Sequence, residues 1–585
     1  MSASHPPRVR AAPARFADEQ AALVDLAALA AAERNPTTSY EAESSSSEES
    51  DVESGPEEGE ERKVSDRREP ARAWRTEHTP VAPHAFLPPR ERRAPPPEAS
   101  TPRDFFRLLL PDEFIERMVE LTNEYAEQQR AANKENEPPA ASLRSQDEDA
   151  RFDWSPTSKE EVCALLGCLI YMGIVCMDAT RDYWAETTRQ PFVADVFTRD
   201  RFLALLRGLR VSEQEEGEEG SEDRLAKLRE LIRTMEEQLL KYFYPGCELT
   251  IDELMILFKG RSIMRQHIAK KASPHGFKVW TLVDVETNYI CALDIYTGIK
   301  GREKEEGASG KVVMTLLDRL QPLCNHIVGL DGYFSSVKLF EQMLARGFYA
   351  VGTTRHNRRH FPRELLAEIA GKESGQWVWR QVRDSPLVAV SWMDKKPVNL
   401  LSTCADPQKA ASVRRWRNGE HVHLACPEVL PLYMRTMRGV DVAAQRYSYS
   451  KIGRRSRKWF YSLTWFLLDV AIHNAFILYQ QKHKLKNYTE KDFRKQLMEQ
   501  LVGAFTIRKC KAKAASSSKR RRDAVHRLER VQERVVCQQC RTRVGDGGHN
   551  QRTHFRCQDC QVALCVPECY NKHIQILEED TVMHE

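Results

Sequence analysis

The chain has 585 residues, with 88 Lys and Arg against 84 Asp and Glu, and it contains 15 cysteines. This length exceeds one ordinary hydrophobic core, so we expect several domains. The polar, Pro-rich and Arg-rich start of the chain lacks the apolar core of a secretory signal. Cysteines scattered through apolar segments indicate the cytosol or nucleus, which argues against a secreted, disulfide-linked protein.

Two blocks of opposite charge stand near the two ends of the chain. Residues 41–61 are almost entirely acidic residues, Ser and Gly, whereas residues 508–534 are strongly basic. A block of like charge is commonly a solvated tail. A basic block between a helical region and a Cys-rich module favours a nucleic-acid contact or a nuclear import signal, so we expect a nuclear protein.

The first part of the chain divides into a polar segment and a helical region. Residues 1–100 are rich in Ala, Pro, Ser, Glu and Arg with few aromatic residues, which predicts disorder. Residues 158–175 predict a buried helix, capped by Thr157 or Ser158. The helical pattern continues over residues 199–243, where an acidic loop interrupts it.

The middle of the chain changes to β-strand patterns. Residues 247–260 and 277–298 contain apolar β-branched runs, and a turn at Asp284–Asn288 predicts a hairpin in the second of them. Helices then alternate with strands, which predicts a mixed α/β sheet. Residues 376–404 predict more strands, and the pattern becomes helical again over 432–505.

The longest apolar stretch is Trp459–Tyr479, and it contains Asp469, His473 and Asn474. Polar residues inside the stretch, and a basic run before it, predict a buried helix rather than a membrane span. A membrane span is the minor alternative.

Three aspartates stand out by their surroundings. Asp252 lies inside an apolar strand, Asp331 follows the C-terminal end of another, and Asp441 lies at or in the next helix. A buried carboxylate needs a partner or a metal, and open α/β sheets bind ligands at the C-terminal ends of their strands. Three converging carboxylates would suit Mg²⁺, although each aspartate alone has an ordinary alternative as a turn former, helix cap or salt-bridge partner.

The last fifty residues form a dense array of potential zinc ligands. Two CxxC pairs and a Cys/His tail predict two interleaved, cross-braced structural zinc sites, and the lack of a secretory signal argues against a disulfide framework. The eighth ligand stays open between His554, His549 and His584. The predicted set is Cys537, Cys540, His554, Cys557, Cys560, Cys565, Cys569 and His573.

Taken together, ordered motifs over about residues 104–573 resemble the piggyBac family of transposases. The matching segments are Trp154–Thr157, Met172–Ile174, Tyr183–Trp184, Thr250–Met255, Phe258–Arg261, Gly276–Trp280, Asp331–Ser336, Trp392–Asp394, Leu400–Thr403, Gly439–Asp441, Arg457–Trp459, Asn474–Ala475 and the Cys/His tail. Each motif alone is weak, but their common order is specific.

This resemblance implies an RNase H-like catalytic domain split by an insertion and flanked by an α-helical dimerisation and DNA-binding domain. It implies cut-and-paste transposition of double-stranded DNA at TTAA sites by a homodimer, without a membrane or a small-molecule substrate. Asp252, Asp331 and Asp441 would coordinate two Mg²⁺ ions, and the zinc module would bind terminal repeat DNA. The implied ranges are 1–100 (disordered), 101–247 and 448–505 (helical), 248–357 and 431–447 (catalytic), 358–430 (insertion), 506–534 (basic linker) and 535–585 (zinc-binding).

The chain departs from the family pattern close to the second and third aspartates. Gly332 stands where Asn is usual, Arg438 replaces the first Gly of a GGVD motif, and Ala444 stands where a further Asp is usual. An active transposase and a domesticated DNA-binding derivative are therefore both open. A RING-like or PHD-like role of the Cys-rich module is a third possibility.

Basic residues outside the aspartate motifs are candidates for contacts with DNA phosphates. Those beside Asp252 have an alternative as neutralising partners of Asp252 and Glu253, and the others have an alternative as a solvated surface. The candidates are Lys259, Arg261, Lys451, Arg454, Arg455, Arg457, Lys458, Lys519, Arg520, Arg521 and Arg522.

Overall fold

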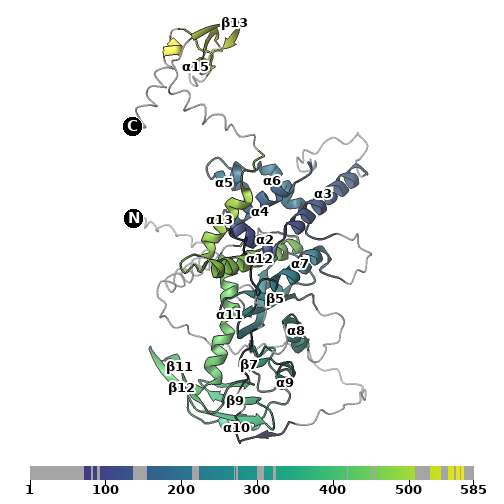
Figure 1. Ribbon diagram of the computed structural model, residues 1–585, viewed down its shortest axis with the longest axis vertical. Coiled ribbons are helices and arrows are strands. Elements are labelled where there is room, and N and C mark those ends of the chain that lie inside the picture. Colours follow the sequence, from purple (N-terminus) through teal and green to yellow (C-terminus); the bar gives the residue numbers. More distant parts are fainter. Residues whose placement is uncertain are drawn as a thin grey trace, which may run out of the picture. The chain divides into compact units, whose positions relative to one another are not determined.

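The fold is given by a computed structural model (Figure 1). The residues that the structure describes are 72–80, 83–88, 93–135, 154–213, 223–268, 271, 274–298, 308–320, 324–417, 419–449, 451–452, 456–507, 528–541, 551–558, 561–566, 568–571 and 573. They belong to two compact units. One comprises Met1–Met177 and Leu205–Gly503, and the other comprises Asp178–Ala204 and Ala504–Glu585.

A mixed sheet of ten strands forms the centre of the first unit, as the alternating pattern predicts. Its order is β1-β8-β9-β10-β7-β6-β2-β4-β3, with β5 paired to β4. Strands β2, β6 and β7 are parallel, and the other pairs are antiparallel. The strands are β1 (Trp74–Arg75), β2 (Glu248–Leu257), β3 (Gln266–His267), β4 (His275–Asp284), β5 (Ile290–Ile295), β6 (Ile327–Leu330), β7 (Tyr349–Thr353), β8 (Trp377–Val382), β9 (Val388–Met393) and β10 (Pro397–Ser402).

Helices pack around this sheet and against one another. Helix α13 packs on α4 and α2, α12 packs on α2 and α7, and α11 crosses β2, β4, β6, β7 and β10. The predicted cap of α4 is confirmed, because the Ser158 hydroxyl accepts a hydrogen bond from the Glu161 N–H at 3.3 Å. The helices are α2 (Pro102–Leu109), α3 (Asp112–Glu135), α4 (Lys159–Ile174), α7 (Arg229–Leu239), α8 (Ala308–Leu317), α9 (Val337–Ala345), α10 (Glu364–Ile369), α11 (Val429–Tyr449), α12 (Trp459–His483) and α13 (Glu490–Val502).

Shorter elements complete the described chain. A separate hairpin of β11 (Ala410–Arg417) and β12 (Glu420–Pro427) packs Val413 and Cys426 into the core formed by β9, β10 and α11. The remaining elements are η1 (Thr180–Trp184), η2 (Ala226–Leu228), α5 (Pro191–Ala194), α6 (Arg199–Gly208), β13 (Leu528–Val536), β14 (Arg552–Cys557) and α15 (Gln538–Arg541).

Helix α12 is buried, as its internal polar residues predict. Among the described helices it is long and apolar enough to cross a membrane, but 94% of its most apolar window is buried. Asp469 on α12 accepts a hydrogen bond from the Arg494 guanidinium at 2.9 Å, and both side chains are 1% exposed. The Asn474 amide bonds both the N–H and the carbonyl of Ile290, at 3.0 and 2.9 Å, and so joins α12 to the start of β5.

The prediction that all of residues 1–100 are disordered is wrong for the described segments after residue 71. Trp74 and Arg75 form β1, which pairs with β8, and the Trp74 indole donates to the His360 carbonyl at 3.1 Å. The Leu87 N–H donates to the Cys324 carbonyl at 3.1 Å. Composition alone misses this because an edge strand provides hydrogen-bond partners for a backbone that cannot form its own core. Residues 1–71 lie outside the described residues.

Candidate functional site

Asp252 and Asp331 occupy adjacent positions on neighbouring parallel strands. Strands β2 and β6 pair in parallel with Ile251 opposite Leu330, so the two aspartates follow directly at the next step of the register. Strand β6 ends at Leu330, and Asp331 begins the turn that follows. This is the C-terminal end of a parallel strand, where side chains of an open sheet are free to meet a ligand.

The two carboxylates share a buried, negatively charged environment. Burial raises the pKa of Asp252 to about 7; the cation of Lys271 opposes this, while Asp331 and Glu253 raise it further. Burial also raises the pKa of Asp331, and the charge of Glu253 adds to the effect. Since like charges at close range disfavour joint ionisation, a divalent cation would stabilise both carboxylates in their charged form.

Two lysines that the sequence analysis did not name as site residues neutralise Glu253, although Lys278 lies within the matching segment Gly276–Trp280. Lys278 Nζ lies 2.9 Å from one Glu253 carboxylate oxygen, and Lys271 Nζ lies 3.5 Å from the other. Burial alone would raise the pKa of Glu253, but these two cations lower it. Strand pairing could have identified Lys278. It lies opposite Met255, and Met255 and Glu253 are two residues apart on β2, so all three side chains lie on one face of the sheet.

Helix α11 brings the third aspartate to the same part of the sheet. A Cβ atom on Gly439 would lie 2.7 Å from Thr250 Cγ2, and one on Gly329 would lie 2.6 Å from Thr436 Oγ1. Thr250 and Gly329 are register partners on β2 and β6, so α11 contacts both strands just before Asp252 and Asp331. The backbone of Asp441 belongs to α11, and its side chain lies outside the described residues.

The departures from the family pattern differ in their structural effect. Arg438 is exposed on α11, whereas the following Gly439 makes the close contact with β2, so the bulk of Arg438 does not enter the helix–sheet interface. A Cβ atom on Gly332 would be 3.6 Å from Thr353 Oγ1, which is ordinary contact, so a side chain is sterically allowed there. The side chain of Ala444 lies outside the described residues.

The predicted DNA-contacting residues fall into separate regions. Lys259 and Arg261 are exposed in the loop after β2. The cations that pair with Glu253 are instead Lys271 and Lys278. Arg457 and Lys458 are exposed at the start of α12, whereas Lys451 is partly buried and its pKa is lowered by that burial. The candidates outside the described residues are Arg454, Arg455, Lys519, Arg520, Arg521 and Arg522.

Lys458 belongs to a cationic cluster that the linear sequence does not reveal. Although the residue as a whole is exposed, partial burial of its ammonium group and repulsion from Arg210, Lys227 and Arg207 lower its pKa. The Arg210 guanidinium lies 3.3 Å from the centre of the Tyr125 ring, and the Lys227 ammonium lies 5.7 Å from that of Phe460. A cluster of several cations suits an anionic ligand such as a phosphate backbone.

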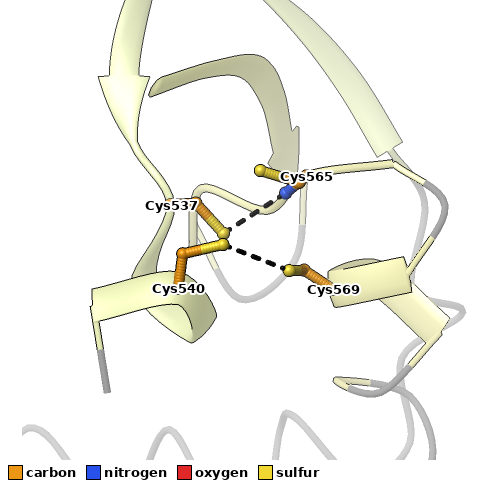
Figure 2. A group of neighbouring side chains, drawn as sticks. All are labelled: Cys537, Cys540, Cys565 and Cys569. Atoms are coloured by element: carbon orange, nitrogen blue, oxygen red, sulfur yellow. Dashed lines mark hydrogen bonds between the residues drawn. The ribbon is translucent and has the colours of Figure 1, made fainter. Parts of the chain in front are cut away.

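Four cysteines of the C-terminal array converge, as Figure 2 shows. The sulfurs of Cys537, Cys540, Cys565 and Cys569 lie within 4.8 Å of one another, and those of Cys540 and Cys569 are 3.6 Å apart. Zinc–sulfur bonds of about 2.3 Å in a tetrahedron separate two sulfurs by about 3.8 Å, so the spacing fits one zinc ion. Burial alone would raise the pKa of Cys537, but the N–H groups of Cys540 and Cys565 lower it to about 7.

The remaining predicted zinc ligands are not brought together among the described residues. Cys557 is buried, but His554 contacts the Val531 carbonyl and the Arg534 guanidinium, each at 3.3 Å. His573 is described and lies outside the four-sulfur group, while Cys560, His549 and His584 are outside the described residues. The first CxxC pair thus meets Cys565 and Cys569, and Cys557 lies between these residues in the chain. No disulfide links the described cysteines.

Comparisons with known proteins identify the family. The family model described as Transposase IS4 matches residues 101–476. PiggyBac transposable element-derived protein 3 of Homo sapiens is 26% identical over 481 residues, covering 80% of this chain and 75% of that protein. PiggyBac transposable element-derived protein 2 of Homo sapiens is 25% identical over 349 residues, covering 57% of this chain and 58% of that protein.

A solved structure has the same overall fold. The cryo-EM structure of a piggyBac transposase synaptic complex with hairpin DNA aligns with a TM-score of 0.62 at 22% identity, covering 82% of this chain and 98% of that chain. The sheet and the matched family model make this chain a member of a transposase family. More particularly, its relatives assign it to the piggyBac family, so the resemblance that the sequence motifs suggest is confirmed.

Proposed function

We propose that this protein is a metal-dependent DNA transposase that cuts and joins DNA strands at TTAA sites. The observation that carries the proposal is the adjacent position of Asp252, within β2, and Asp331, directly after β6, with pKa values raised by burial and by neighbouring carboxylates. A phosphodiester is anionic, so carboxylates alone would repel it. Carboxylates that act on DNA therefore need bound cations to offset this repulsion.

Asp252, Asp331 and Asp441 would hold two Mg²⁺ ions. When bound, these ions supply an activated oxygen nucleophile and stabilise the charge of the leaving oxygen. The protein's own residues position the carboxylates: the N–H groups of Tyr333 and Phe334 donate to Asp331 Oδ1 at 3.1 and 3.3 Å. Lys271 and Lys278 neutralise Glu253, which limits the negative charge around the metal ligands.

The sheet supports an RNase H-like core within this proposal. The order β5-β4-β2-β6-β7 combines antiparallel pairing of the first three strands with parallel pairing of the last three, as expected of such a core. We propose that residues 248–357 and 431–447 form this domain and that 358–430 is the insertion. Strands β8 to β10 of the insertion extend the same sheet beyond β7.

The other parts of the chain would bind DNA and zinc. We propose that the helical regions 101–247 and 448–505 mediate homodimer formation and binding of double-stranded DNA, with the cationic cluster around Lys458 contacting phosphates. The module at 535–585 would hold two structural zinc ions and bind terminal repeats, with the four converged sulfurs as one site. A nuclear location follows from a DNA substrate.

An excision assay tests the enzymatic proposal. A reporter would be flanked by TTAA-bounded inverted repeats taken from the DNA around this gene, and wild type would be compared with Asp331→Ala in Mg²⁺. We expect excision by wild type and none by Asp331→Ala, with DNA binding retained in both. Asp318→Ala, which changes an exposed carboxylate, is the matched control and should excise normally.

A second candidate function is a domesticated protein that binds DNA without cutting it. Ala444 favours this alternative because the family pattern has a further aspartate at that position. Binding of the terminal repeats by wild type without any excision would support it. Excision that depends on Asp331 would reject it and would show that Ala444 is compatible with catalysis.

A further inference from the structure

Tyr333 exposes an aromatic ring directly beside the carboxylate site. The residue is 36% exposed, whereas its neighbour Phe334 is 1% exposed. Among large hydrophobic residues in the described chain, Trp416 is the other aromatic residue that is exposed, at 48%, and it lies on the β11–β12 hairpin. An exposed aromatic ring next to a buried acidic site is therefore a specific feature of this part of the molecule.

The Tyr333 ring is held in place by its neighbours. The Lys278 ammonium lies 4.4 Å from the centre of the ring, and Lys278 is itself fixed by its 2.9 Å ion pair with Glu253. The ring also packs edge-to-face on Phe334, with centroids 5.0 Å apart and planes at 82°. These cation–π and aromatic contacts restrict the ring although part of it faces solvent.

The backbone around Tyr333 is fixed relative to the second aspartate. The Tyr333 N–H donates to Asp331 Oδ1 at 3.1 Å. The carbonyl groups of Gly332 and Tyr333 both accept hydrogen bonds from the Arg358 guanidinium, the first at 3.1 Å. The position of the ring is therefore coupled to that of the carboxylate.

We propose that Tyr333 stacks against an unpaired nucleobase of the DNA strand whose phosphodiester lies at Asp252 and Asp331. This inference rests on the proposed function. The base and phosphate of a nucleotide are joined through one sugar, so a phosphate at the carboxylates brings a nearby base within reach of residue 333. Every base offers a flat face, so an aromatic ring binds it with little dependence on sequence. Lys278 is then the positioning residue that holds the ring.

Fluorescence of an unpaired base provides the test. The probe is a DNA duplex with a short unpaired end, carrying 2-aminopurine at the first unpaired position. It would be mixed with the full-length chain, with Ca²⁺ in place of Mg²⁺ to prevent cleavage. We expect quenching by wild type and by Tyr333→Phe, and loss of quenching with Tyr333→Ala. The affinity of Tyr333→Ala for the probe should fall about tenfold, as expected for one lost base–aromatic stack.

A matched variant separates this effect from general loss of aromatic surface. Trp416→Ala removes the other exposed aromatic side chain and should quench as wild type does. Thermal unfolding should differ only slightly among the variants, because both side chains lie at the surface and Tyr333→Ala loses only its contacts with Lys278 and Phe334. Equal quenching by Tyr333→Ala and wild type would overturn the inference.

The excision assay distinguishes failure of this inference from failure of the proposed function. Excision by wild type without Tyr333-dependent quenching would refute base stacking and leave the transposase proposal standing. Quenching that depends on Tyr333, without excision, would reject the transposase and retain Tyr333 as a DNA-contacting residue. A wild-type protein that binds none of these DNA probes would contradict both.

Discussion

At the scale of single residues, the site depends on contacts that leave no room for one extra carbon atom. Gly439 and Gly329 allow α11 to approach β2 and β6, and both approaches lie just before an aspartate. Neighbouring positions in one motif therefore differ in whether they can accept a side chain larger than that of glycine. Arg438 is exposed and Gly439 is buried in the contact, although the motif alone presents both positions as glycine positions.

We predict that Gly439→Ala destabilises the first unit. Alanine normally favours a helix over glycine by about 1 kcal/mol, but its Cβ would meet the stiff Thr250 side chain at 2.7 Å. Overpacking of this kind costs about 1–3 kcal/mol, so after the helix gain is subtracted the net loss should be up to about 2 kcal/mol. Arg438→Ala is the control and should be nearly neutral. Denaturant unfolding monitored by tryptophan fluorescence measures the difference, and equal midpoints for the two variants would contradict the predicted clash.

At the scale of elements, a buried ionic network joins α12 to α13. Arg494 bonds Asp469 at 2.9 Å and Glu490 at 2.8 Å, and His473 Nδ1 lies 3.0 Å from the other Glu490 oxygen. Burial raises the pKa of Asp469 to about 6 despite Arg494. Burial alone would also raise the pKa of Glu490, but Arg494 and His473 lower it to about 2. Glu490 is therefore the member whose charge stabilises the network.

We predict that Glu490→Gln lowers stability by about 3 kcal/mol at pH 7, since each pKa unit corresponds to about 1.4 kcal/mol. The folded-state pKa lies below the ordinary value of 4.5, so this contribution is complete above pH 4.5. It is lost as the pH falls toward 2, and the gap between variant and wild type should narrow over that window. Calorimetry at several pH values measures it. The control is Glu499→Gln, which changes an exposed residue on the same helix and should have little effect on stability. If the stability difference between Glu490→Gln and wild type did not change with pH, the charge of Glu490 would not be its cause.

The C-terminal module should contain about two zinc ions per chain. Elemental analysis of the purified protein measures the count. Cys565→Ser removes one of the four converged sulfurs and should lower the count by about one, whereas Cys176→Ser, which changes an exposed thiol of the first unit, should not alter it. A count near one in wild type would reject the two-site arrangement.

At the scale of the whole molecule, the groups proposed to contact DNA lie in two separate units of the chain. The carboxylate site and the cationic cluster around Lys458 belong to the first unit, and the Cys-rich module belongs to the second. Linked modules that bind the same DNA raise each other's effective concentration, so loss of one weakens overall binding without changing the fold of the other.

Deletion of residues 535–585 should therefore reduce affinity for terminal repeat DNA, on the order of 100-fold. Thermal unfolding of the first unit should be unchanged, because the deleted residues all belong to the second unit. Fluorescence anisotropy with labelled end DNA measures the affinity. Restoration of binding by lowering the salt concentration would show that the remaining contacts are electrostatic. Equal affinity of the truncated and complete chains would remove the module from end recognition.

The amino-acid sequence by itself determined the features that depend on local pattern. The β4–β5 hairpin, the capped α4, the buried α12 and the family motifs follow from periodicity, turn residues and spacing between neighbours. The metal-binding roles of Asp252, Asp331 and Asp441 stay predictions, although strand order and register bring the first two together.

Only the tertiary structure decided which distant residues meet. In the folded protein β1 pairs with β8, and Lys278 and Lys271 form ion pairs with Glu253. The sulfurs of Cys537 and Cys540 lie close to those of Cys565 and Cys569. These contacts depend on strand register and on segments that are far apart in the chain. Local propensity carries no information about them, because the free energy of such pairing arises only when the complete sheet and module are assembled.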